Sequence, residues 1–85
     1  MENYKVDITN SAQKEIKNLD SQAIKRIVEK LKSLEGNPFP SGYKKLVAKD
    51  GYRIRVGDYR IIYDVLEKEK IVRVYRAGHR KDIYR

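Results

Sequence analysis

Three arginines stand close together in the segment GYRIRVGDYRIIY, which covers residues 51–63. Alternating residue types predict two β-strands there, joined by a two-residue Gly-Asp turn. Such a turn places Arg55 opposite Arg60, and because strand side chains alternate, Arg53 points to the same face. Like charges opposed across strands are destabilising, so an anion, most simply a phosphate, is the expected compensation. A merely solvated sheet face is the alternative, but arginine is by geometry the better phosphate ligand.

The C-terminal tail holds a second group of reactive side chains: His79, Arg80, Lys81 and Tyr84 lie within six residues. An imidazole can act as general acid or base, although an idle, exposed ring is the alternative for His79. It is the only histidine and cannot form a metal site alone. No serine–histidine–aspartate set, carboxylate pair, phosphate-binding glycine loop or metal motif is found, so we expect neither metal nor cofactor.

A basic cluster without a metal can support cleavage of RNA, in which the substrate's own 2′-hydroxyl attacks the neighbouring phosphate. The protein must then orient that hydroxyl, neutralise the developing charge and protonate the leaving oxygen. DNA lacks this internal nucleophile. The same cluster also fits a module that binds RNA without cutting it.

The elements that position these residues divide the chain into two halves. The first half predicts a strand at residues 4–8 and two helices, with N-caps at 9–11 and 20–21. A loop rich in glycine and proline follows at 36–42. Apolar residues at helical spacing form one stripe on the helices: Ala12, Ile16, Leu19, Ile24, Ile27, Val28, Leu31 and Leu34.

The second half predicts an antiparallel meander that ends before a tail without clear periodicity. Its strands are expected at 43–47, 51–56, 59–66 and 71–76. One sheet face is apolar and the other carries the arginines. The 85 residues are enough for one domain, 1–85, of the α+β class. We expect an antiparallel sheet of about four to five strands, with the N-terminal helical hairpin packed on one face.

The net charge of +8 is unevenly distributed. Residues 1–42 carry seven basic and six acidic side chains, whereas residues 43–85 carry thirteen and six. This asymmetry favours a polyanionic partner for the second half. The chain has no cysteine and no apolar run near the roughly 18 residues of a membrane span, so we expect a cytoplasmic protein without membrane contact.

Taken together, the pattern resembles the RelE family of type II toxin–antitoxin systems. The similarity includes YKVDIT at 4–9, YKKL at 43–46, the arginine hairpin, and the closing AGHRKDIYR at 77–85. The resemblance implies a RelE-like toxin domain that cuts mRNA in the ribosomal A site and is neutralised by a RelB-like antitoxin. Ribosomal RNA and mRNA are the implied nucleic-acid partners.

The same resemblance implies roles for individual residues. Arg53 and Arg55 match two basic positions before the turn, and Arg60 matches the arginine that stabilises the transition state. Arg80 matches a tail arginine near the leaving group, and Tyr84 a tyrosine that orients the substrate. The family often has lysine at the first two positions. Arginine is a poor general base, so either charge stabilisation suffices or another group handles the proton.

Other basic residues are assigned to binding. His79 stands where the family varies and is therefore a secondary catalytic candidate. We expect Lys44, Lys45, Lys81 and Arg85 to contact RNA or the ribosome. Two alternatives stay open: a ParE-like toxin that inhibits gyrase, and a non-catalytic RNA- or ribosome-binding module. The basic tail with its tyrosine favours RNA cleavage over gyrase inhibition.

Overall fold

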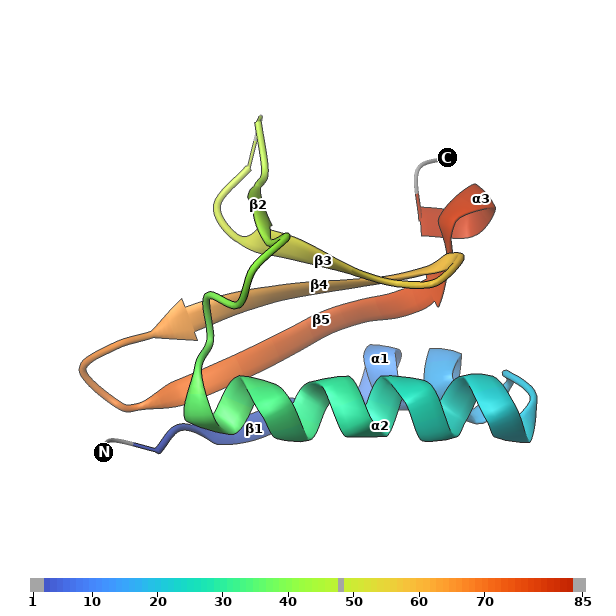
Figure 1. Ribbon diagram of the computed structural model, residues 1–85, viewed down its shortest axis with the longest axis horizontal. Coiled ribbons are helices and arrows are strands. Elements are labelled where there is room, and N and C mark those ends of the chain that lie inside the picture. The colour runs from blue at the N-terminus through green and yellow to red at the C-terminus, as the bar shows by residue number, and fades with distance from the viewer. Residues whose placement is uncertain (1–2, 48, 84–85) are drawn as a thin grey trace.

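The computed structural model describes residues 3–47 and 49–83 of the chain, and it has the predicted α+β architecture. In chain order the elements are β1 (Lys5–Ile8), α1 (Asn10–Lys17), α2 (Ser21–Gly36), β2 (Lys44–Lys45), β3 (Tyr52–Val56), β4 (Tyr59–Leu66), β5 (Ile71–His79) and α3 (Arg80–Ile83). Figure 1 shows α1 and α2 together on one side of the sheet, and the short α3 on the other. None of the helices within these ranges is long and apolar enough to cross a membrane.

The sheet has five strands in the order β1-β5-β4-β3-β2. The pairs from β2 to β5 are antiparallel, as predicted, but β1 lies parallel to β5 at the edge. The sheet is therefore mixed, because alternation reveals a strand but not its direction. The strand predicted at 43–47 is shorter than expected and pairs only through Lys44 and Lys45.

Both N-terminal helices begin at the predicted caps. The hydroxyl of Thr9 accepts a hydrogen bond from the Ala12 N–H at 3.2 Å, and the carboxylate of Asp20 accepts one from the Ala23 N–H at 2.8 Å. Each cap satisfies a backbone donor that the first helical turn leaves without a partner. The caps thus fix where the helical hairpin starts and how it meets the sheet.

The core lies between the helical hairpin and one sheet face. From α2, Ile27, Leu31 and Leu34 are buried, whereas Val28 is 38% exposed despite its place in the predicted stripe. The opposing sheet residues include Tyr63, which is fully buried. Its hydroxyl donates to the Pro38 carbonyl at 2.8 Å, which ties the loop after α2 to the centre of the sheet.

The β3–β4 hairpin has the predicted register, with Arg55 opposite Arg60. Strand β5 departs from the prediction, because its pairing with β4 shifts at Tyr75. Tyr63 pairs with Val74 while its neighbour Ile62 pairs with Arg76, so Tyr75 is the extra residue of a bulge. The bulge lets β5 continue to His79, through residues that had been expected to belong to an irregular tail.

The buried phenol of Tyr63 predicts a loss of stability at high pH. Burial raises the pKa of Tyr63 from 10.0 to about 12. Above pH 10 the unfolded chain therefore gives up this proton before the folded one. The free energy of unfolding should then fall by about 1.4 kcal/mol per pH unit until the folded pKa is reached.

Urea unfolding of the wild type and Tyr63→Phe at pH 9 and pH 11 measures this component. At pH 9 the variant should be less stable by about 1–3 kcal/mol, because the Pro38 carbonyl loses its donor. The difference should shrink by about 1.4 kcal/mol at pH 11, since only the wild type carries the buried phenol. An equal difference at both pH values would contradict this account.

Candidate anion and RNA site

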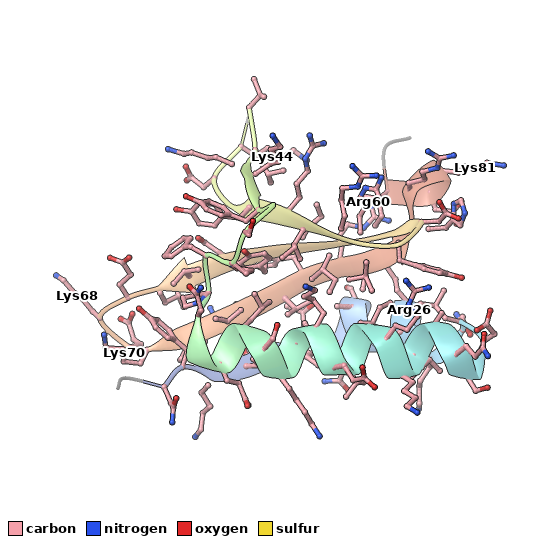
Figure 2. The ribbon with its side chains drawn as sticks, in the orientation of Figure 1. Arg26, Lys44, Arg60, Lys68, Lys70 and Lys81 are labelled. Carbon is pink, nitrogen blue, oxygen red and sulfur yellow. The ribbon has the colours of Figure 1, made fainter. Side chains whose placement is uncertain are left out.

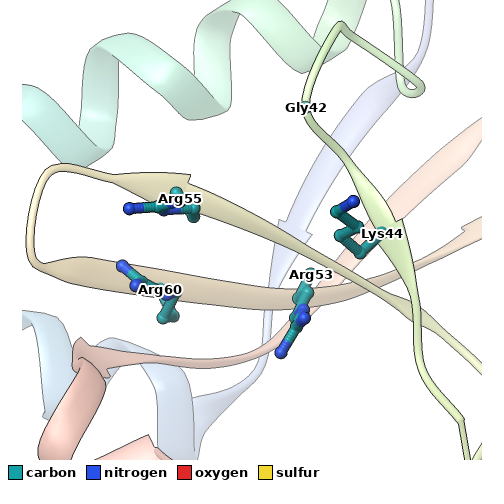
Figure 3. Close-up of a pocket in the computed structure, with 5 residues that line it drawn as sticks. All are labelled: Gly42, Lys44, Arg53, Arg55 and Arg60. Carbon is teal, nitrogen blue, oxygen red and sulfur yellow. The ribbon is translucent and has the colours of Figure 1, made fainter.

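A basic hollow lies on the sheet face opposite the helical hairpin. It has a volume of about 170 Å³ and is lined by Gly42, Lys44, Arg53, Arg55 and Arg60. Figure 3 shows the four cationic side chains arranged along the hairpin and the adjacent β2. The structure thus brings together the three predicted hairpin arginines and adds Lys44, which had been assigned only to RNA binding.

Two like-charged pairs face each other across the strands that form this hollow. Arg55 is opposite Arg60 in the β3–β4 register, and Lys44 is opposite Arg53 in the β2–β3 register. Such juxtapositions cost stability. The sequence does not predict that Lys44 faces Arg53, because this pairing depends on the register of β2. An anion in the hollow would relieve the repulsion between Arg55 and Arg60.

Arg60 differs from its two neighbours because it is buried. It was expected on an open face, yet its side chain is only 7% exposed. Its Nη1 donates to the carbonyls of Gly57 at 3.0 Å and Tyr59 at 2.9 Å. These two hydrogen bonds fix the guanidinium before any ligand arrives, which is the condition for strong electrostatic stabilisation of a developing charge. Arg55, by contrast, is exposed.

Strand β5 lies beside Arg60, and Gly78 is opposite it in the β4–β5 register. A methyl group at Gly78 would lie 3.6 Å from the Cδ1 of Ile83 in α3. Helix α3 therefore packs on β5 at the strand position opposite Arg60.

The tail residues lie near the hairpin turn. Arg80 begins α3, and its backbone N–H donates to the Asp58 carbonyl at 2.8 Å, while its side chain is exposed. The Nδ1 of His79 accepts a hydrogen bond from the Lys81 N–H at 3.2 Å. The structure therefore brings Arg80 to the same end of the hairpin as Arg60. Figure 2 labels the next residue, Lys81, which lies at the same end of the sheet as Arg60.

The remaining predicted residues lie elsewhere or are not described. Lys45 lines a different hollow, formed with Leu46, Val47, Lys49 and Asp50. Lys81 is exposed on α3. Tyr84 and Arg85 lie outside the described residues, so their predicted roles stay predictions. Within residues 3–47 and 49–83, no group of three or more histidine, aspartate or glutamate side chains is placed to hold a metal ion.

The chemistry available in the hollow is charge neutralisation. Its lining is cationic apart from Gly42, and arginine does not release its proton in proteins. Guanidinium groups match the oxygens of a phosphate through paired hydrogen bonds. The site therefore fits a phosphodiester whose negative charge increases during a reaction.

Comparison with known proteins identifies the class of protein to which this chain belongs. The family model described as "ParE toxin of type II toxin-antitoxin system, parDE" matches residues 6–84, nearly the whole chain. The chain therefore belongs to this family, within the RelE/ParE superfamily of type II toxins.

Solved structures place the chain near RelE. The archaeal RelE–RelB complex from Pyrococcus horikoshii OT3 is 32% identical, with a TM-score of 0.82, and the match covers 92% of this chain and 96% of that one. The RelBE2 complex from Mycobacterium tuberculosis is 25% identical, with a TM-score of 0.82, over 91% of this chain and 98% of that one. The intact E. coli RelBE complex is 27% identical, with a TM-score of 0.79, over 89% and 95%. The resemblance to RelE seen in the sequence motifs is thus confirmed.

Proposed function

We propose that this toxin is a ribosome-dependent endoribonuclease, an mRNA interferase that cuts translated mRNA in the A site. The cut is made by the 2′-hydroxyl of the substrate, which attacks the adjacent phosphate without a metal ion. The observation that carries the proposal is the cationic hollow with Arg60 fixed at its end by two backbone carbonyls. In this proposal residues 1–85 form a single RelE-like toxin domain.

In this mechanism the arginines have different tasks. Arg60 stabilises the charge on the pentavalent phosphate from a preset position. Arg53 and Arg55, on the adjacent strand, bind and neutralise the same phosphate group. Arg80 lies near the leaving oxygen, and Tyr84 orients the substrate. Because arginine is a poor base, these arginines accelerate the reaction mainly by stabilising negative charge and not by taking up a proton.

The partners follow from the relatives and from the charge. The similar structures from P. horikoshii, M. tuberculosis and E. coli are toxin–antitoxin complexes, which supports a RelB-like antitoxin for this chain. Ribosomal RNA and mRNA are the proposed nucleic-acid partners, contacted by Lys44, Lys45, Lys81 and Arg85. The protein would then act in the cytoplasm, where translation occurs.

Binding to programmed ribosomes should depend steeply on salt. If the four proposed RNA-binding residues, Lys44, Lys45, Lys81 and Arg85, each neutralise one phosphate of single-stranded RNA, the logarithm of affinity falls with a slope of about −2.8 against the logarithm of salt concentration. Raising KCl from about 50 to about 200 mM at constant Mg²⁺ should then weaken binding by about 50-fold. Fluorescence titration of labelled toxin measures the slope.

Two substitutions test where this slope originates. Lys44→Ala should reduce its magnitude by about 0.7, since Lys44 lines the hollow and one phosphate contact is lost. Lys68→Ala is the matched control, because Lys68 is exposed in the β4–β5 turn, far from Arg60 in Figure 2. It should leave the slope unchanged. A flat salt response, or equal changes in both variants, would count against the hollow as the RNA site.

A gyrase-directed activity is the second candidate, because the matching family model carries the ParE name. The two activities separate in one pair of assays. Mapping mRNA 5′ ends in a translating extract should show new ends that depend on the toxin. Supercoiling by purified gyrase should be unaffected, and inhibition of gyrase without new mRNA ends would establish the ParE-like activity instead.

A further inference from the structure

The hairpin turn connects the two parts of the site through three consecutive backbone carbonyls. Those of Gly57 and Tyr59 accept from the guanidinium of Arg60. The carbonyl between them, of Asp58, accepts from the N–H of Arg80 at 2.8 Å. The position of Arg60 and the start of α3 are therefore set by the same three peptide groups.

His79 stands at the junction of this turn and α3. Its Nδ1 accepts from the Lys81 N–H at 3.2 Å, so the imidazole caps the first turn of α3 as an asparagine side chain caps a longer helix. Its ring packs edge-on against Tyr59 of β4, with the centroids 5.6 Å apart and an interplanar angle of 79°. The cap secures the start of α3, while buried Ile83 secures its end.

This contact limits what His79 can do in catalysis. A neutral imidazole has one nitrogen that accepts and one that donates, and here the accepting nitrogen is engaged with the backbone. The ring cannot use that lone pair to take a proton from substrate without releasing the cap. His79 is thus better suited to holding α3 than to transferring protons.

We infer that His79 is a positioning residue, whose Nδ1 holds α3 against the hairpin turn and thereby keeps Arg80 beside Arg60. This inference rests on the proposed nuclease function, because it assigns Arg80 to the reaction. His79 then acts on the reaction through the position of Arg80 and does not contact the substrate itself.

Three substitutions separate this role from acid–base catalysis. His79→Asn places an acceptor oxygen where Nδ1 lies, His79→Gln carries its amide farther out, toward the place of Nε2, and His79→Ala removes both. All three lose the ring packing against Tyr59, so that loss is common to the series and cancels in the comparison. Only the asparagine variant keeps the cap.

Single-turnover cleavage on saturated programmed ribosomes should show this order. We expect His79→Asn to cleave within about threefold of the wild type. The alanine and glutamine variants should be about tenfold slower, which is the free-energy cost of losing a helix cap converted into a ratio of rates. Affinity for ribosomes should be unchanged across the series, since the cap alters placement rather than charge. Equal rates in all four proteins, equal loss in all three variants, or rescue by glutamine alone would overturn the inference.

Hydrogen exchange provides a readout that does not depend on activity. The backbone amides of Arg80 and Lys81 should be protected in the wild type and in His79→Asn. They should exchange about tenfold faster in the alanine and glutamine variants. If the wild type cut no mRNA, the proposed function would fail. The exchange pattern would still show whether the side chain of residue 79 caps α3, and uniform exchange across the series would refute the cap.

Discussion

Arg60→Ala is expected to lower the rate of mRNA cleavage on the ribosome by about 100- to 1000-fold, the usual effect of removing a preorganised group that stabilises transition-state charge. The structural reason is that Arg60 is buried and fixed by two carbonyls. In the proposed reaction it would therefore meet the phosphate without reorganising. Single-turnover cleavage with primer-extension readout measures the rate. Ribosome affinity should fall far less than the rate.

Two controls separate this effect from damage to the fold. Arg60→Lys keeps the charge but cannot hold the same planar geometry, so its rate should lie between those of the wild type and the alanine variant. Lys68→Ala removes an exposed cation from the opposite end of the sheet and should cleave normally. Near-normal cleavage by a folded Arg60→Ala protein would show that the assignment of Arg60 is wrong.

Arg55→Thr is expected to change activity and stability in opposite directions. The substitution removes the charge that faces Arg60 and inserts a residue that favours strands. The free energy of unfolding should rise by about 0.2–1 kcal/mol, the cost of a like-charged cross-strand pair. The cleavage rate should fall by about 100-fold, because the phosphate loses one of its cationic ligands.

Urea unfolding and single-turnover cleavage on the same preparations test both parts. Arg73→Thr is the matched control, since Arg73 is also an arginine in the sheet but pairs with Asp7 at 3.0 Å. Its loss should bring no gain in stability and little change in rate. If Arg55→Thr were less stable than the wild type, the opposed arginines would not be a strained pair, and the case for an anion between them would weaken.

The hairpin part of the site was predictable because local geometry determines it. A two-residue turn fixes the cross-strand register, so the pairing of Arg55 with Arg60 follows from residues only a few positions apart. The helix caps at Thr9 and Asp20 were predictable for the same reason. Both kinds of signal rest on short-range contacts that spacing reveals.

The burial of Arg60 was not predictable because alternation gives the face on which a strand residue lies, not what covers it. A bulge at Tyr75 interrupts the alternation of β5, so the strand seemed to end before Gly78. Only the extended strand places Gly78 opposite Arg60 and brings α3 over the outer face. Lys44 joined the site for a similar reason, since its short strand pairs through a register that no sequence pattern indicates.

The central claim, that the 2′-hydroxyl of mRNA is the nucleophile in a cationic site on the ribosome, can be tested with one modified message. Programmed ribosomes would carry an mRNA with a single 2′-deoxynucleotide immediately 5′ of the scissile phosphate. We predict that the wild-type toxin cuts the all-RNA message to leave a 2′,3′-cyclic phosphate, and that the deoxy message stays intact while binding equally well. Cleavage of the deoxy message at the same phosphate, or of free mRNA without ribosomes, would contradict the account.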